Sequence, residues 1–259
     1  MVEHRQLAEG RRALRGGLLT DAKAFYEAGY TQPDAAEALR LGRWREIGAR
    51  SKAAHVRELC ARARLKPRTV VEIGCGDGAL LAQLRGFAAV LDGFELSAPA
   101  AELARAAVPG ARRIEAYDGE TVPAEDGAYD LAILSHVVEH VADPVPLLVE
   151  AARVAYEVVV EVPLEDNRSG RRAGNVAESE RIGHLHRFSR ADVRELLDAA
   201  GLVVQAELTD PLPLAHHTFG AGLAKGGAKW LARRVLHRLI PRTSEELVTL
   251  HYAALARRP

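Results

Sequence analysis

The sequence predicts an α/β protein with a parallel sheet, and three observations lead to this fold class. Short runs of β-branched residues alternate with helical stretches from residue 69 onward, as expected for a sheet covered by helices on both faces. The first run leads into a glycine-rich turn, and the composition, 48% hydrophobic and 27% charged, is that of a folded domain. The strands expected in this region are residues 70–73, 88–94, 113–116, 131–134 and 158–162.

The predicted helices between the strands carry capping signals. Ser97 precedes an alanine-rich helix, and Asp143 is an N-cap candidate followed by Pro144 at the first helical position. Ser189 caps a further helix that is expected to stop at Gly201. These signals set the approximate limits of the helices.

The chain is expected to divide into an N-terminal helical cap, residues 1–66, and a main domain, residues 67–259. Apolar residues at helical spacing favour helices in the first part. Tyr26, Tyr30 and Trp44 are expected either to form a lid over the binding site or to pack in a core.

Three later segments complete the expected main domain. Two further strands are predicted, at residues 202–208 and 247–255. Residues 219–240, between them, are predicted to form a helical insertion with a basic face. This insertion either packs over the site or makes a peripheral contact with an anionic membrane surface. Residues 164–182 are predicted to form a long polar loop, a kind of segment that often carries function.

Charge and cysteine content argue against several classes of function. The chain has 35 basic and 35 acidic residues, whereas nucleic-acid binding relies on many basic contacts with phosphate. No apolar run reaches the roughly 20 residues that cross a bilayer. Two cysteines are too few for a disulfide framework, and the charged N-terminus does not resemble a signal peptide. A cytoplasmic location is therefore expected.

Residues 70–78, VVEIGCGDG, are the most informative segment. A buried strand leads into Gly74, Gly76 and Gly78 and then into a helix, so the backbone can approach a ligand at the N-terminus of that helix. A dinucleotide-binding loop would place its third glycine one residue later. Glu72 and Asp77 give the segment negative charge, which favours a cationic ligand over a phosphate.

This E-x-G-x-G-x-G pattern resembles the first motif of the class I S-adenosylmethionine-dependent methyltransferases, in particular the small-molecule enzymes of the ubiquinone-biosynthesis type. Their cofactor has a sulfonium and an ammonium group but no phosphate, in agreement with the acidic loop. The resemblance extends over about residues 66–201 and includes YDLAILSHVVEHVADP, residues 129–144. It implies a seven-stranded, Rossmann-like doubly wound sheet of order 3-2-1-4-5-7-6 with the last strand antiparallel.

The resemblance also implies which residues bind S-adenosylmethionine. Glu95 in GFELS matches the acidic residue that accepts from both ribose hydroxyls. Asp118 with Gly119 matches the pair beside the adenine ring, and Ser135 with His136 is expected to face the methionine part. The complete predicted set is Glu72, Gly74, Gly76, Gly78, Glu95, Leu96, Asp118, Gly119, Ser135 and His136.

Histidines are the candidate catalytic residues, because methyl transfer to a hydroxyl needs a proton acceptor. His136 and His140 are expected one turn apart on the helix after the fourth strand, and His184 and His186 follow the polar loop in GHLHRFS. We predict that His140, His184 or His186 is the general base. For each of them, a structural role in closing the loop over the site is the alternative.

The segment His136-x-x-Glu139-His140 also fits the H-x-x-E-H pattern of inverted zinc proteases. Residues four apart share one face of a helix, so the spacing permits a metal. The same segment already fits a methyltransferase, however, and no distal third ligand is evident. No metal site is therefore predicted, and a divalent metal that orients the acceptor is the less favoured alternative.

The predicted function is methyl transfer from S-adenosylmethionine to an oxygen or nitrogen of a small biosynthetic metabolite, with oxygen favoured by the histidines. The alternatives are a catalytically silent cofactor-binding partner subunit and, less favoured, a nicotinamide-dependent oxidoreductase. Arginines in residues 164–182 and 219–240 predict an acceptor that is anionic or is presented at an anionic surface. The sequence predicts no oligomeric state.

Overall fold

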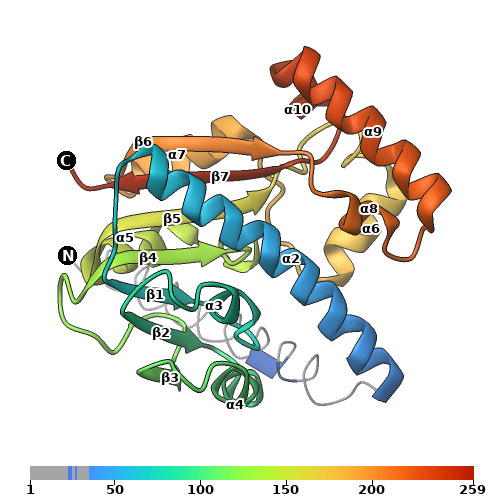
Figure 1. The fold of residues 1–259 in the computed structure, drawn as a ribbon. Coiled ribbons are helices and arrows are strands. Elements are labelled where there is room, and N and C mark those ends of the chain that lie inside the picture. Colours follow the sequence, from blue (N-terminus) through green and yellow to red (C-terminus); the bar gives the residue numbers. More distant parts are fainter. Residues whose placement is uncertain (1–22, 25–26, 28–34) are drawn as a thin grey trace, which may run out of the picture.

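The computed structural model describes residues 23–24, 27 and 35–259, and a seven-stranded sheet forms its centre (Figure 1). The strand order is β3-β2-β1-β4-β5-β7-β6. Neighbouring strands run parallel except β7, which is antiparallel to both β5 and β6. These features confirm the predicted fold class and strand order. The strands are β1 Thr69–Ile73, β2 Val90–Glu95, β3 Arg113–Ala116, β4 Tyr129–Ser135, β5 Ala155–Pro163, β6 Val203–Asp210 and β7 His251–Arg257.

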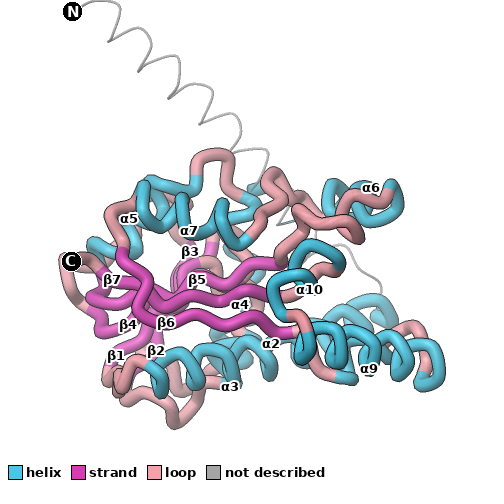
Figure 2. The backbone as a smooth tube through the Cα atoms, turned by 90° about the horizontal axis from the view of Figure 1, so that it is seen from above, coloured by secondary structure: helices cyan, strands magenta, loops and turns pink. Residues whose placement is uncertain are grey.

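Helices cover both faces of the sheet (Figure 2). Helices α2, α3 and α4 lie on one face, and α5 and α7 lie on the other. Alternate strand residues therefore enter two separate apolar layers, with Val70 in the layer that contains α2 and Val71 in the layer that contains α5. The helices are α2 Ala35–Arg62, α3 Ala79–Gln83, α4 Ala98–Ala107, α5 Pro144–Val154, α6 Ala173–Arg181, α7 Arg190–Ala199, α8 Leu214–Thr218, α9 Leu223–Leu239 and α10 Pro241–Leu247, with a 3-10 turn η1 at Val138–His140.

Helix α2 covers the sheet across β6 and β7 and also packs against α3 (Figure 1). Its residues Val56 and Leu59 are completely buried in the apolar layer on that face. Trp44 has its ring centroid 5.2 Å from those of His216 and Phe219, so this end of α2 packs against α8. Tyr26 and Tyr30, the other aromatic residues of the predicted lid, lie outside the described residues.

Three segments differ locally from the sequence prediction. The last strand begins at His251 and not at residue 247, because Pro241 starts helix α10, which extends to Leu247. The polar segment 164–182 is loop only in its first half, since α6 occupies Ala173–Arg181. The insertion 219–240 is helical from Leu223, after a left-handed glycine, Gly222, with φ of 75°.

Helix α9 projects from the body of the protein next to α8 and α10 (Figure 1). Gly226 packs so closely against the backbone of His217 that an added Cβ atom would lie 2.3 Å from its carbonyl oxygen. Leu223 and Leu239 are 78% and 72% exposed. Among the helices of the described ranges, none is long and apolar enough to span a bilayer.

The topology brings one end of each of the seven strands to one edge of the sheet. The carboxyl ends of β1, β2, β4 and β5 meet there, as expected for parallel strands. Because β7 is antiparallel to β5, its first residue, His251, pairs with Pro163 at the end of β5. This edge contains most of the predicted site residues.

The hydroxyl of Tyr129 is predicted to contribute to fold stability. It donates a 2.6 Å hydrogen bond to the fully buried Asp92, which also accepts from Arg112. We expect Tyr129→Phe to lower the free energy of unfolding by about 1–3 kcal/mol, because the buried carboxylate loses a donor. The matched control is Tyr156→Phe, a change at a ring that is 68% exposed, with an expected effect below about 0.5 kcal/mol. Equal urea-denaturation midpoints for the two variants would contradict this account.

Candidate active site

The glycine loop after β1 has a backbone that only glycine adopts readily. Gly74, Gly76 and Gly78 have φ angles of 78°, 54° and 76°. A Cβ atom on Gly74 would lie 2.6 Å from a methyl group of Val137, and one on Gly78 would lie 3.0 Å from Ala104. The loop therefore has both a left-handed backbone and close neighbours on each side.

Glu95, at the end of β2, holds this loop in place. Its carboxylate accepts hydrogen bonds from the backbone N–H of Gly76 (2.8 Å) and of Ser97 (2.9 Å). Burial raises the pKa of Glu95, and the two N–H donors oppose that effect. A carboxylate has about four lone-pair sites, so two of them are left for the paired hydroxyls of a ribose.

Glu72, inside β1, is a buried carboxylate below the glycine loop. It is 3% exposed, and its Oε2 atom has no hydrogen-bond partner among the described residues. Burial raises the pKa of Glu72 well above its ordinary value, while the charge of Lys52 in α2 opposes the effect. An unpartnered buried carboxylate is suited to an ammonium group, and the cofactor named above carries one. The donor set of the loop therefore fits S-adenosylmethionine.

An ion pair between helix α2 and the glycine loop was not predicted from the sequence. Arg45 Nε donates to Asp77 Oδ2 across 2.5 Å, so helix α2 is attached to the acidic residue of the loop. Nothing in the spacing of these residues, which are 32 positions apart, indicates the contact.

The loop after β3 is shaped by Asp118. Its Oδ1 atom accepts from the backbone N–H groups of Glu120 (2.8 Å) and Thr121 (2.7 Å), and Gly119 between them has φ of 84°. This is an Asx-type turn, in which the Asp118 side chain itself stabilises the backbone conformation of the loop. Leu96, the neighbour of Glu95, is half-buried at the same edge.

The end of β4 places Ser135 and His136. Ser135 is buried, and its hydroxyl has no hydrogen-bond partner in the described part of the chain. His136 has φ of 59°, a left-handed backbone that is uncommon outside glycine, and its N–H donates to the carbonyl of Glu161. The ring of His136 turns toward Glu161 and His251. The predicted helix directly after the strand is in fact the short 3-10 turn η1.

His140 and His184 lie against each other, with ring centroids 4.7 Å apart. His140 Nδ1 lies 3.0 Å from the carbonyl of Gly183, and His184 Nδ1 lies 2.8 Å from Glu165 Oε2. Because a carbonyl oxygen only accepts, the neutral His140 ring carries its proton on Nδ1 and its lone pair on Nε2. Burial lowers the pKa of His140 below 6.5, so this neutral form predominates at pH 7.

Glu139 lies beside this histidine pair and is 1% exposed. A carboxylate oxygen of Glu139 and a ring nitrogen of each of His140 and His184 lie within 4.8 Å of one another. Although burial favours the neutral acid, the contact with His136 holds the pKa of Glu139 at about 2. The carboxylate is therefore ionised next to the two rings.

His186, the third predicted base, is placed differently. Its Nε2 atom donates to the carbonyl of Val141 (2.8 Å), and its ring stacks on Phe188 at 5.4 Å. The backbone N–H groups of Leu185 and His186 both donate to the carbonyl of Glu139. These contacts bring the GHLHRFS segment onto the turn after β4, and they favour a structural role for His186.

A second buried group centres on Glu161 of β5. His55 Nδ1 lies 3.2 Å and His251 Nδ1 lies 3.1 Å from Glu161 Oε1, and Asp210 contacts the other side of His55. Burial lowers the pKa of His251 to about 4, whereas for His55 the two carboxylates outweigh burial and raise its pKa to about 9. The sequence prediction omitted His55, Asp210 and His251. The predicted antiparallel last strand was the available signal, because it brings the first residue of that strand to this edge.

Two of the four arginines in residues 164–182 are paired with acids of their own segment. Arg171 contacts Asp166 at 2.9 Å, and Arg181 contacts Glu178 at 2.6 Å. Arg168 has no side-chain ion pair among the described residues, and it lines a hollow of about 350 Å³ with Asp166 and Arg171. Arg172 also has no side-chain ion pair in the described part of the chain, and Glu246 lines the same hollow, so two arginines and two acids face it.

Comparison with known proteins identifies the class. A family model described as a methyltransferase domain matches residues 44–207, more than half of the chain. The chain belongs to this family, the S-adenosylmethionine-dependent methyltransferases, and S-adenosylmethionine is its cofactor. This result confirms the resemblance of the glycine loop, and it gives no support to the nicotinamide-dependent alternative.

Individual relatives differ in their acceptors. The ubiquinone biosynthesis O-methyltransferase of Thiobacillus denitrificans is 30% identical over 137 residues, a match that covers 47% of this chain and 58% of the relative. The chain thus spans little more than half of that relative's length. A solved structure from Thermotoga maritima, named as a possible histamine N-methyltransferase, has a TM-score of 0.61 at 18% identity and covers 92% of this chain and 100% of its own. The geranyl diphosphate C-methyltransferase of Streptomyces coelicolor has a TM-score of 0.60 at 15% identity, covering 80% and 79%.

The first prediction at this site concerns Glu95. We expect Glu95→Gln to weaken S-adenosylhomocysteine binding by about 10- to 100-fold, because two charge-assisted acceptor positions are lost. Glu102→Gln, at an exposed acid of helix α4, is the matched control and is expected to bind as the wild type does. Calorimetric titration measures both, and wild-type affinity in Glu95→Gln would exclude this role.

The second prediction separates backbone strain from crowding in the glycine loop. Gly74→Ala combines a left-handed φ with a clash against Val137, whereas Gly86→Ala has a φ of 77° and no neighbour within 4 Å. Each φ costs about 1–2 kcal/mol for a non-glycine residue. We expect only Gly74→Ala to lose cofactor affinity and to be the less stable of the two. Identical unfolding midpoints and affinities would show that Val137 adjusts without cost.

Proposed function

We propose that this protein transfers a methyl group from S-adenosylmethionine to an oxygen or nitrogen atom of a small biosynthetic molecule, with oxygen favoured. The observation that carries the proposal is the half-buried His140–His184 pair, whose rings are each oriented by a fixed partner. Carbon acceptors, such as geranyl diphosphate in the Streptomyces enzyme, fit this pair less well because their proton is lost only after attack. The two free cysteines, both buried, suit a reducing compartment such as the cytoplasm.

In the proposed reaction, some residues of the site bind the cofactor and others accept the proton. S-adenosylmethionine, when bound, supplies a methyl group made electrophilic by the sulfonium. Glu72, Glu95 and the glycine loop hold its polar groups and thereby fix the direction of in-line attack. The neutral His140 ring takes the acceptor's proton on Nε2, and the nearby Glu139 carboxylate stabilises the imidazolium that forms. The predicted assignments of Ser135 and His136 to the methionine part stay part of this proposal.

Replacement of the histidines tests the proposal. We expect His140→Gln and His184→Gln each to lower turnover by about 10²–10⁴-fold while S-adenosylhomocysteine affinity changes less than about threefold. Turnover is measured by transfer of a labelled methyl group to a panel of phenols, hydroxy acids and amines. His186→Gln serves as the comparison and is expected to affect stability more than turnover. Wild-type turnover in His140→Gln would contradict the assignment of His140 as the base.

The pH dependence follows from the lowered pKa of His140. A base must be neutral, so turnover is expected to fall as the pH drops through a pKa below 6.5 and to be constant at higher pH. In His140→Gln this acidic limb should disappear from the residual activity. Circular dichroism at each pH controls for unfolding. A wild-type midpoint above 6.5 would contradict the assignment.

A catalytically silent partner subunit is the alternative that keeps the fold. It predicts cofactor binding with no labelled product from any acceptor of the panel. We further propose that the acceptor is anionic, on the basis of Arg168 at the hollow beside the polar segment. Contact of α9 with an anionic membrane surface also stays a proposal, supported by its exposed Leu223, Leu231 and Leu239 next to basic residues.

A further inference from the structure

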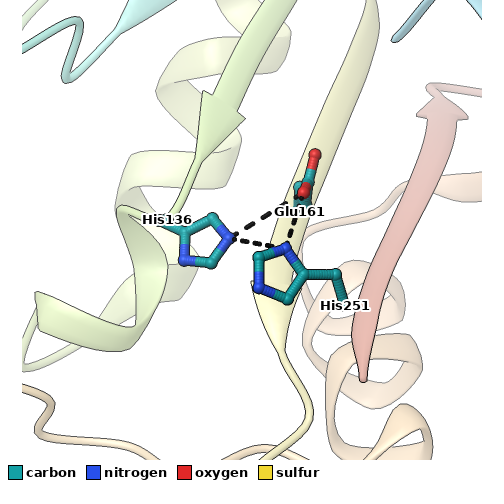
Figure 3. Close-up of side chains that lie close together, drawn as sticks. All are labelled: His136, Glu161 and His251. Carbon is teal, nitrogen blue, oxygen red and sulfur yellow. Dashed lines mark hydrogen bonds and ion pairs between the residues drawn. The ribbon is translucent and has the colours of Figure 1, made fainter. Parts of the chain in front are cut away.

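His136, Glu161 and His251 bring three metal-ligating atoms together at the carboxyl edge of the sheet (Figure 3). His136 Nε2 and His251 Nδ1 are 3.3 Å apart, and Glu161 Oε1 is 3.1 Å from His251 Nδ1 and 3.8 Å from His136 Nε2. A tetrahedral ion with bonds of about 2.1 Å has ligand atoms about 3.4 Å apart. The observed triangle has edges of this size.

Hydrogen bonding alone explains this arrangement poorly. Charge-assisted bonds between a ring nitrogen and a carboxylate are about 2.7–2.9 Å long, and the contacts to Glu161 Oε1 are all longer. Three ring nitrogens, those of His55, His136 and His251, approach this one oxygen atom. The other carboxylate oxygen of Glu161, Oε2, is buried and has no hydrogen-bond partner among the residues that the structure describes.

The surroundings orient the ligand atoms. His136 Nδ1 lies 3.2 Å from Glu139 Oε1, an ion-pair contact without hydrogen-bond geometry that favours a ring with its proton on Nδ1 and its lone pair on Nε2. Carboxylate–histidine contacts of this kind support ligands in metal sites. Glu161 contacts His55 in addition to His251, so it is held from the side of helix α2.

The charge balance also suits a cation. Glu161 and Glu139 are both 1% exposed, and Asp210 lies on the far side of His55. Lys52 in α2 opposes these charges, because its ammonium acts electrostatically on His136 and His251. His55 is a second cation, since its pKa is about 9. The three carboxylates against Lys52 and His55 leave one net negative charge for a divalent ion.

We propose that His136, Glu161 and His251 bind one divalent transition-metal ion of the zinc type through two imidazoles and one carboxylate. Three protein ligands leave one position of a tetrahedron open, as in sites that bind a substrate atom. The side chain of His136 is 20% exposed, so the group is not completely closed to solvent. Use of that position for the acceptor oxygen rests on the proposed function, whereas binding of the ion does not.

Metal titration tests the proposal without reference to turnover. Tag-free protein is dialysed against a chelator and titrated with Co²⁺ and with Zn²⁺, with calorimetry and the visible absorption of tetrahedral cobalt as readouts. We expect the wild type to bind one equivalent of metal ion tightly. Glu161→Gln and His251→Ala should weaken it at least 100-fold, and bound Zn²⁺ should raise the melting temperature of the wild type only.

Two matched variants make the result specific. His140→Gln removes a histidine of the neighbouring Glu139–His140–His184 group, and His216→Gln removes a buried histidine whose ring lies 6.4 Å from that of His251. Both variants should still bind one equivalent of metal ion tightly. The absence of stoichiometric binding in the wild type, or its loss in His140→Gln with retention in His251→Ala, would overturn the proposal. Because cofactor affinity is measured separately, a failed metal site leaves the methyltransferase assignment unaffected.

Discussion

Burial of carboxylates at one edge of the sheet is the constraint on which the site depends. Glu72, Glu95, Glu139 and Glu161 are each at most 7% exposed. A buried carboxylate is costly unless donors or cations surround it. Glu95 meets this requirement through backbone N–H groups, Glu139 and Glu161 meet it through contacts with histidines, and Glu72 meets it in part through the charge of Lys52. These buried acids therefore favour hydrogen-bond donors or positively charged groups as their neighbours.

The antiparallel direction of β7 determines which residues meet there. If this strand ran parallel to its neighbours, its first residue would lie at the opposite edge. Because it runs antiparallel between β5 and β6, His251 reaches Glu161, although they are 90 residues apart in the chain. Strand β6 runs in the same direction as β5, so Asp210 at its carboxyl end reaches the same edge and lies 3.1 Å from His55. The chemistry of the acceptor side thus follows from topology.

Sequence reasoning was strong where function depends on a contiguous segment and weak where it depends on contacts across the fold. The glycine loop and the position of Glu95 after its strand were predictable because a strand, a turn with left-handed residues and an acidic residue leave a local pattern. The strand order was predicted from the family resemblance. The Ser189 cap was also predictable, and it forms a capping box with Asp192. The group around Glu161 leaves no such pattern, since His55, Glu161 and His251 come from three distant elements. In place of the helix expected directly after β4, the structure has a left-handed His136 followed by the 3-10 turn η1.

Helix α2 joins the two halves of the site mechanically. Arg45 near its beginning holds the glycine loop through Asp77, and His55, ten residues later, holds Glu161. At a rise of 1.5 Å per residue, Arg45 and His55 are about 15 Å apart along the same helix. A ligand that moves helix α2 at Asp77 also changes its position at Glu161. Thermodynamic linkage then requires each ligand to change the affinity for the other by the same factor. Cofactor and acceptor affinities in this protein are therefore expected to be thermodynamically coupled, with α2 as the element that both ligands bias.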